Sequence, residues 1–183
     1  MLNLKIAAQE IWQGFHWSFF INIQGLIICL RRFELELREG NLPQAKTELQ
    51  TATKLMLASG AAMQLAGSIS PELYEAQIRP SMMPPHVKSH DFSGLMSWEH
   101  SVLIKLWKQL RPYFANLPIE LKAQHQEFVD AYLYLASSHR AICQKFGGEE
   151  TGSLRFERSC AVEVLDAFAR SRCQFINPET TSS

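Results

Sequence analysis

The chain lacks an excess of charge of either sign. Its 183 residues include 18 Lys and Arg and 18 Asp and Glu, so the formal net charge at pH 7 is zero. A nucleic-acid-binding protein usually shows a basic excess or stripe, whereas the longest run of basic residues here is Arg31-Arg32. Hydrophobic residues make up 46% and charged residues 20%, which is typical of a globular protein. We therefore expect one domain over residues 1–176, with a frayed tail at 177–183, that does not bind nucleic acid.

Long hydrophobic runs and paired cysteine motifs are also missing. The most apolar stretch, Phe15–Leu30, is interrupted by polar residues, and a membrane-spanning helix needs roughly 20 apolar residues. The N-terminal residues have no pattern of a secretory signal. None of the cysteines forms a C-x-x-C pair; they are Cys29, Cys143, Cys160 and Cys173. These features favour a reduced, cytoplasmic protein that does not enter a membrane.

No segment alternates apolar and polar residues for long enough to predict a strand, whereas helical periodicity recurs along the chain. Gly40-Asn41 ends the first helix and Pro43 begins the second. Pro112 and Pro118 are expected to lie between two later helices, and residues 79–92 are expected to form a proline-rich irregular loop. The helices are expected at 4–38, 43–66, 71–77, 93–111, 119–146 and 154–172. The fold class is therefore all-α, a single helical bundle of about five main helices.

Two histidines lie on apolar helix faces. His16 comes one turn after Trp12, and His139 shares a face with Phe128, Tyr132, Ala136, Cys143 and Phe146. A core histidine bonded to a backbone carbonyl is the simplest explanation for either one alone. Two such residues on different core-facing stripes favour a cofactor between helices, and neutral imidazole is a common axial ligand of haem iron.

A di-iron site, a zinc site and a cysteine nucleophile are alternatives to a haem site. A di-iron carboxylate bundle needs Glu-x-x-His pairs, and no histidine has a glutamate three residues before it. A zinc site at His86, His90 and Asp91 stays open, although a proline-broken loop does not fix its geometry. Contact of Cys143 with His139 also permits cysteine nucleophile chemistry. Arg79 is a candidate to bind a substrate carboxylate, because its planar fork matches that group.

The pattern from residue 12 to residue 172 resembles the haem-dependent tryptophan 2,3-dioxygenase / indoleamine 2,3-dioxygenase superfamily. The residues that carry the resemblance are Trp12 and His16 in FHWSFFINIQGLI, Ser70-Pro71 and Arg79 in SISPELYEAQIRP, Ser93-Gly94 in FSGLMSWEH, and His139, Thr151, Gly152 and Ser153 in SHRAICQKFGGEETGSLRF. Residues 79–93 are longer than the family's equivalent, and GGEETGS replaces a tighter GTGGS. The resemblance implies a tryptophan-dioxygenase-like bundle that binds haem and oxidises an aromatic amino acid or indole-like substrate with O₂.

The resemblance also implies roles for single residues. His139 would be the axial ligand of the haem iron and His16 a catalytic group on the opposite face. Substrate-binding roles fall on Trp12, Arg79, Met82, Thr151 and Gly152. The haem environment would include Ser93, Gly94, Phe128, Tyr132 and Cys143. Cys143 follows His139 by four residues, a spacing at which some related aromatic hydroxylases tether haem covalently.

Two alternatives remain open. One is a haem-dependent aromatic hydroxylase, and the other is a non-enzymatic helical haem-binding or interaction protein. A homodimer or higher homo-oligomer is a further expectation, since the apolar first helix offers a surface for an interface.

Overall fold

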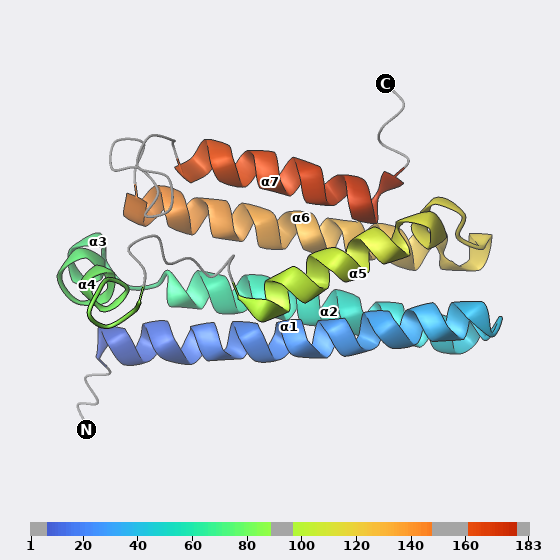
Figure 1. The fold of residues 1–183 in the computed structure, drawn as a ribbon, viewed down its shortest axis with the longest axis horizontal. Helices are drawn as coiled ribbons and strands as arrows, with labels where there is room; N and C mark the ends of the chain where they lie inside the picture. The colour runs from blue at the N-terminus through green and yellow to red at the C-terminus, as the bar shows by residue number, and fades with distance from the viewer. Residues whose placement is uncertain (1–6, 89–96, 148–160, 179–183) are drawn as a thin grey trace.

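The computed structural model of the chain describes residues 7–88, 97–147 and 161–178. All regular structure in these ranges is helical, which confirms the predicted all-α bundle. Five long helices build the body of the molecule (Figure 1): α1 (Ala8–Arg38), α2 (Leu42–Ala66), α5 (Trp98–Ala115), α6 (Ile119–Gly147) and α7 (Ala161–Ile176). Helices α1, α2, α6 and α7 follow the long axis of the molecule, and α5 crosses it obliquely.

The hairpin of α1 and α2 depends on a short turn. Gly40 adopts φ of 72°, a left-handed conformation that glycine takes at low cost. Asn41 then caps α2, because its side chain accepts a hydrogen bond from the amide of Gln44, and Pro43 stands in the first turn of α2. The chain therefore reverses direction within a few residues, and α1 and α2 pack along their length.

One large hydrophobic core holds the long helices together. Its fully buried members include Leu26, Leu30 and Phe33 of α1, Leu49 and Met56 of α2, Leu110 of α5, and Leu121 and Phe128 of α6. A smaller cluster lies at one end of the bundle, around Ala8, Ile69, Ile78 and Phe146. The division matters for function, because the smaller cluster adjoins the histidines.

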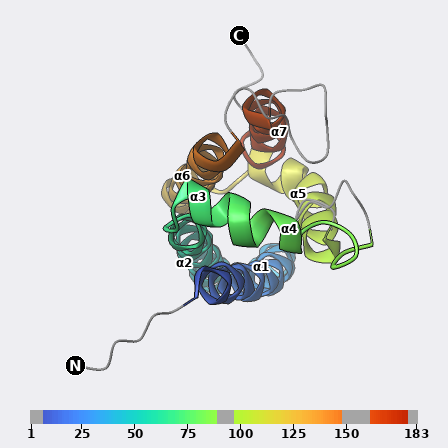
Figure 2. The ribbon, with the colours of Figure 1, turned by 90° about the vertical axis from the view of Figure 1, so that its left-hand side faces the viewer.

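That end of the bundle is closed by a continuous helical segment. It comprises α3 (Pro71–Leu73), the π-helix η1 (Tyr74–Ile78) and α4 (Arg79–Ser81), and it runs across the end of the bundle (Figure 2). The prediction that the irregular loop begins at Arg79 is therefore wrong, since the helix continues through Ser81. The wider π-helical turn precedes Pro80, whose ring would clash with the carbonyl of residue 76 in a regular α-helix.

The prediction for Pro112 is also wrong. Pro112 lies inside α5, which begins at Trp98 behind the N-cap Ser97 and continues to Ala115. A proline in a helix removes one backbone hydrogen bond. Here the last turn is nevertheless held in place by Phe114, which is 2% exposed in the core.

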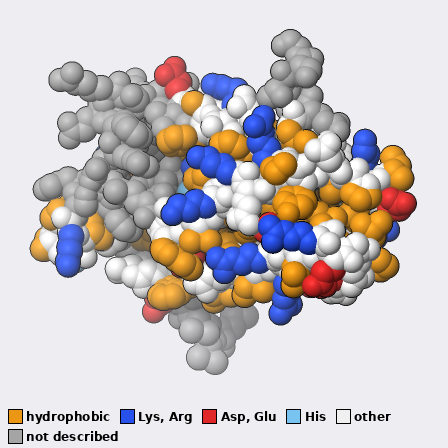
Figure 3. Space-filling model, turned by 45° about the vertical axis from the view of Figure 1, so that its right-hand side comes forward, with side chains coloured by type: hydrophobic (Ala, Val, Ile, Leu, Met, Phe, Trp, Pro, Cys, Tyr) orange, Lys and Arg blue, Asp and Glu red, His pale blue; other side chains and the backbone are white. Residues whose placement is uncertain are grey.

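The outer surface mixes hydrophobic and basic side chains. On the face drawn in Figure 3, Lys and Arg lie among hydrophobic side chains. Exposed hydrophobic residues on α1 are Trp17, Ile21, Ile28 and Leu35. None of the described helices is both long and apolar enough to cross a membrane. Self-association stays a prediction.

Candidate active site

An aromatic cluster occupies the closed end of the bundle. The Trp12 ring lies 4.2 Å from the His16 ring, 5.5 Å from Tyr74 and 6.2 Å from Phe146, measured between centroids. Tyr74 and Phe146 stack at 4.3 Å with nearly parallel planes. Met82 packs against the same cluster. The structure therefore brings together Trp12, His16 and Met82, as the predicted site requires, and adds Tyr74 from η1.

The tautomer of His16 is set by a backbone contact. Its Nδ1 lies 2.8 Å from the carbonyl oxygen of Trp12, one turn earlier in α1. A carbonyl can only accept, so Nδ1 carries the proton and Nε2 keeps its lone pair. Burial lowers the pKa of His16, and the bond to Trp12 opposes that shift. At neutral pH His16 is therefore an uncharged imidazole whose Nε2 can accept a hydrogen bond or a proton.

His139 of α6 is a second uncharged imidazole. Burial lowers its pKa to about 4, with further lowering from the charge of Arg172 and from His16 in its protonated form. No side-chain hydrogen bond of His139 is present in the described part of the chain. A neutral ring with an uncommitted nitrogen has the chemistry of a metal ligand.

His100 is a site residue that the sequence analysis missed. It lies in the first turn of α5, and burial lowers its pKa to about 4, with further lowering from Arg172 and His139. Its Nε2 is buried and has no hydrogen-bond partner. His16, His100 and His139 thus come from three different helices and all are neutral. Among residues 7–88, 97–147 and 161–178, no group of three or more His, Cys, Asp or Glu side chains is arranged to hold a metal ion.

Cys143 lies one turn beyond His139 on α6, as its spacing predicted. Burial raises the pKa of the Cys143 thiol to about 11, so the thiol is protonated at neutral pH. Burial also raises the pKa of Tyr74 to about 12, and the nearby Cys143 contributes to that rise. Cys143 therefore lies one helical turn from His139 and close to Tyr74 of the aromatic cluster.

Three predicted site residues have other surroundings than expected. Arg79 forms an ion pair with Glu75 at 3.0 Å on its own helical segment, so its charge is already matched. Phe128 is fully buried in the large core beside Phe114, about 16 Å along α6 from His139 at 1.5 Å per residue. Tyr132 is buried, its ring meets the Trp107 ring edge to face, and its hydroxyl donates to the carbonyl oxygen of Ala169.

Several other predicted positions lie outside the described residues. They are Ser93, Gly94, Thr151 and Gly152 of the haem proposal, Ser153 of the same segment, and His90 and Asp91 of the zinc alternative.

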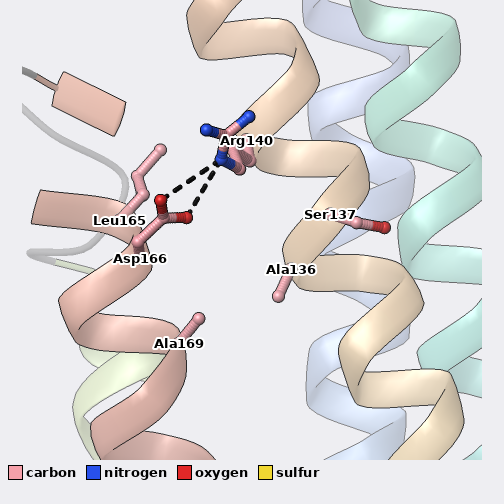
Figure 4. A pocket seen from close by; sticks show the side chains of 6 residues that line it. All are labelled: Ala136, Ser137, Arg140, Leu165, Asp166 and Ala169. Atoms are coloured by element: carbon pink, nitrogen blue, oxygen red, sulfur yellow. Dashed lines mark hydrogen bonds and ion pairs between the residues drawn. The ribbon is translucent and has the colours of Figure 1, made fainter. Parts of the chain in front are cut away.

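A shallow pocket between α6 and α7 lies next to the site but is separate from it (Figure 4). Its lining includes Ala136, Arg140, Asp166 and Ala169. Arg140 points at Asp166 across the pocket, with Nε 3.0 Å from Oδ1. The cation of this pocket is therefore neutralised, and His139 does not line it.

Comparison with known proteins supplies the family. The SfmD 3-methyl-L-tyrosine peroxygenase family matches residues 5–124, which hold Trp12, His16, Tyr74, Arg79 and His100. The chain belongs to this family. A 3-methyl-L-tyrosine peroxygenase of Streptomyces lavendulae is 30% identical over 175 residues, covering 90% of this chain and 46% of the relative.

The chain thus spans about half the length of the curated relative it matches. No solved structure matches it. The peroxygenase family was not anticipated from the sequence, and neither similarity names the tryptophan and indoleamine dioxygenases. That resemblance, and dioxygenase chemistry with it, therefore stays a prediction.

The neutral histidines predict how stability of the haem-free protein depends on pH. His100 and His139 have pKa values near 4 when folded, against about 6.5 in an unfolded chain. Between pH 4 and pH 6.5 the unfolded chain binds more protons than the folded chain. The free energy of unfolding therefore has its full value above pH 6.5 and decreases as the pH falls toward 4. Each histidine contributes a slope of up to about 1.4 kcal/mol per pH unit.

Urea unfolding of the haem-free protein at pH 7.0, 5.5 and 4.5 measures this dependence. The variant His100→Asn should lose the contribution of one histidine to the slope of unfolding free energy against pH. The contribution of His139 should remain, because His139 and the charge of Arg172 are unchanged. An exposed residue, His86, serves as the control through His86→Asn. An identical slope in His100→Asn and the native protein would contradict the assignment.

Proposed function

We propose that this chain binds haem between its histidine-bearing helices and oxidises an aromatic amino acid with a peroxide. The observation that carries the proposal is the group of uncharged imidazoles from α1, α5 and α6, which includes an unpartnered Nε2 on His100. Buried polar atoms normally have partners. A haem iron suits neutral imidazole ligands, so the residues present fit this cofactor.

His139 is the proposed ligand of the iron, and Cys143 is the proposed attachment point for a haem side group. Haem would supply the activation of the peroxide, and the protein would bind and orient the substrate and exclude water. His100 offers a second imidazole nitrogen near the same centre. Ser93 and Gly94 keep their proposed contacts with haem.

The aromatic cluster is proposed to bind the ring of the substrate. Trp12, Tyr74 and Phe146 present apolar ring faces and edges, and Met82 adds an adaptable thioether. His16 would accept the proton of a substrate O–H or N–H on Nε2, since its Nδ1 proton is committed to the Trp12 carbonyl. Thr151 and Gly152 keep their proposed contacts with the amino-acid end of the substrate.

The test begins with the full chain purified with haem supplied. We expect a Soret band, and we expect 3-methyl-L-tyrosine to shift it. Addition of hydrogen peroxide should then give a product heavier by one oxygen atom, with water as the second product. Addition of two oxygen atoms from O₂ under reducing conditions would instead favour the dioxygenase alternative. A colourless protein that takes up no haem would favour a plain interaction bundle.

The role of His16 has its own expected result. His16→Leu should keep the Soret band and lower the rate of peroxide-dependent product formation by about 10²–10⁴, the usual contribution of a general base. His86→Leu, at an exposed position, is the matched control and should retain the native rate. Product formation at the native rate in His16→Leu would remove the proton-accepting role. Stopped-flow kinetics with mass spectrometry of the product gives both measurements.

A further inference from the structure

Arg172 of α7 is one of three partly buried arginines of the described chain, and the other two, Arg79 and Arg140, form ion pairs. Arg79 is paired with Glu75, Arg140 with Asp166, and Arg38 with Glu34. Arg172 is partly buried, and no carboxylate within the described ranges forms an ion pair with it. A charge moved out of water normally needs a partner of opposite sign. The missing anion is therefore a feature that needs an explanation.

The contacts of Arg172 hold its guanidinium without neutralising it. Tyr132 interacts with it electrostatically, while the Tyr132 hydroxyl donates to the carbonyl oxygen of Ala169 at 3.2 Å. The guanidinium carbon also lies 5.0 Å from the centre of the Phe168 ring. A guanidinium has five N–H donors in a fixed plane. Among the described residues, no acceptor atom hydrogen-bonds to these donors.

No negative charge within residues 7–88, 97–147 and 161–178 forms an ion pair with Arg172. Its positive charge acts on His100 and His139 and lowers the pKa of both, so it lies close to the two imidazoles. Two further buried groups, Nε2 of His100 and Nε1 of Trp107, have no hydrogen-bond partner. The Trp107 ring meets the Tyr132 ring edge to face at 5.4 Å. Within the described part of the chain, this side of the bundle therefore combines a cation that has no ion pair with an indole N–H that has no acceptor.

We propose that Arg172, whose guanidinium lies over the Phe168 ring, binds a carboxylate inside the bundle beside His139. The carboxylate belongs either to the amino-acid substrate or to a haem propionate, and both sources present the same chemistry to the guanidinium. The proposal rests on the proposed function for the identity of these ligands. It transfers the carboxylate-binding role from Arg79, whose charge is matched by Glu75.

Two pairs of ligands distinguish the sources. The first pair is haem and haem dimethyl ester, whose propionates are blocked, with uptake followed by absorbance. The second is 3-methyl-L-tyrosine and its carboxamide, with binding to the purified full chain measured by calorimetry. For one of these two ligand pairs, we expect the native protein to bind the compound with the free carboxylate about tenfold to a hundredfold more tightly than its blocked counterpart. This is the range expected of a charge-assisted hydrogen bond. Arg172→Gln should abolish that preference.

The controls separate a binding role from a structural one. Arg172→Lys keeps the charge without the fork and should retain part of the preference. Arg140→Gln and Arg79→Gln remove paired arginines and should leave it unchanged. Circular dichroism confirms that each variant is folded. The proposal is overturned if the Arg172→Gln variant keeps every preference for a free carboxylate that the native protein shows. It is also overturned if the Arg79→Gln variant loses such a preference and the Arg172→Gln variant keeps it. If no haem is taken up, the proposed function fails, and the calorimetric pair still decides the role of Arg172.

Discussion

His139→Ala is expected to abolish the Soret band of the protein purified with haem supplied. The imidazole of His139 is uncharged at neutral pH and has no hydrogen bond to another side chain in the described structure. Its removal therefore takes away the proposed iron ligand and leaves no buried donor newly unpaired. We expect the variant to fold, with a far-ultraviolet circular dichroism spectrum like that of the native chain, and to bind haem at least a hundredfold more weakly.

The matched control for this experiment is His86→Ala, which alters an exposed histidine and should leave the Soret band unchanged. His100→Ala tests the second imidazole and should shift the band without abolishing haem uptake. Cys143→Ser tests covalent attachment: haem should remain with the native protein after acid–acetone extraction and leave the Cys143→Ser variant. A Soret band of native intensity in His139→Ala would defeat the proposed ligand.

Part of this site is visible in the sequence because it is local. Trp12 and His16 are one turn apart on one helix, and so are His139 and Cys143, so helical periodicity alone predicts that each pair shares a face. The five long helices follow from the same periodicity together with the stops at Gly40 and Pro118. The ion pair of Glu75 and Arg79 also has i, i+4 spacing, and this signal could have shown that Arg79 is neutralised.

The rest of the site depends on packing between distant segments. His100 meets the site because α5 lies across the bundle, and nothing near His100 in the sequence indicates its neighbours. Tyr74 reaches Phe146 only because η1 folds back over the end of α6. Arg172 left a weak signal, since it follows Phe168 by one turn on the inward side of α7. A cation on an otherwise apolar helix face can be noticed, but its missing partner appears only in the tertiary structure.

The helical face of Phe128 shows how periodicity can mislead. Phe128 and His139 share a face, yet eleven residues of helix separate them by about 16 Å. Periodicity gives the direction of a side chain but not its position along the axis. Phe128 stacks at 6.2 Å on Phe114 of α5, which also stacks at 5.9 Å on Phe33 of α1. We therefore interpret Phe128 as a residue of the large core.

This interpretation predicts that Phe128→Ala destabilises the fold and leaves the haem spectrum unchanged. Phe128 is 0% exposed, and truncation of a buried phenylalanine costs about 3–5 kcal/mol of unfolding free energy through lost burial and the cavity left behind. Urea unfolding at constant pH measures the loss as a lower midpoint. Leu133→Ala, on the same helix but 47% exposed, is the matched control and should change stability by less than about 1 kcal/mol.

Because a domain of this size has a total stability of about 5–15 kcal/mol, Phe128→Ala could leave little folded protein. Phe128→Leu keeps most of the apolar volume, so it should lower the midpoint by a smaller amount and remain folded for spectroscopy. The Soret position of Phe128→Leu should then equal that of the native protein, since the altered ring lies three helical turns from His139. A shifted Soret band with an unchanged urea midpoint would reverse the interpretation and place Phe128 against the haem, as its helical face first indicated.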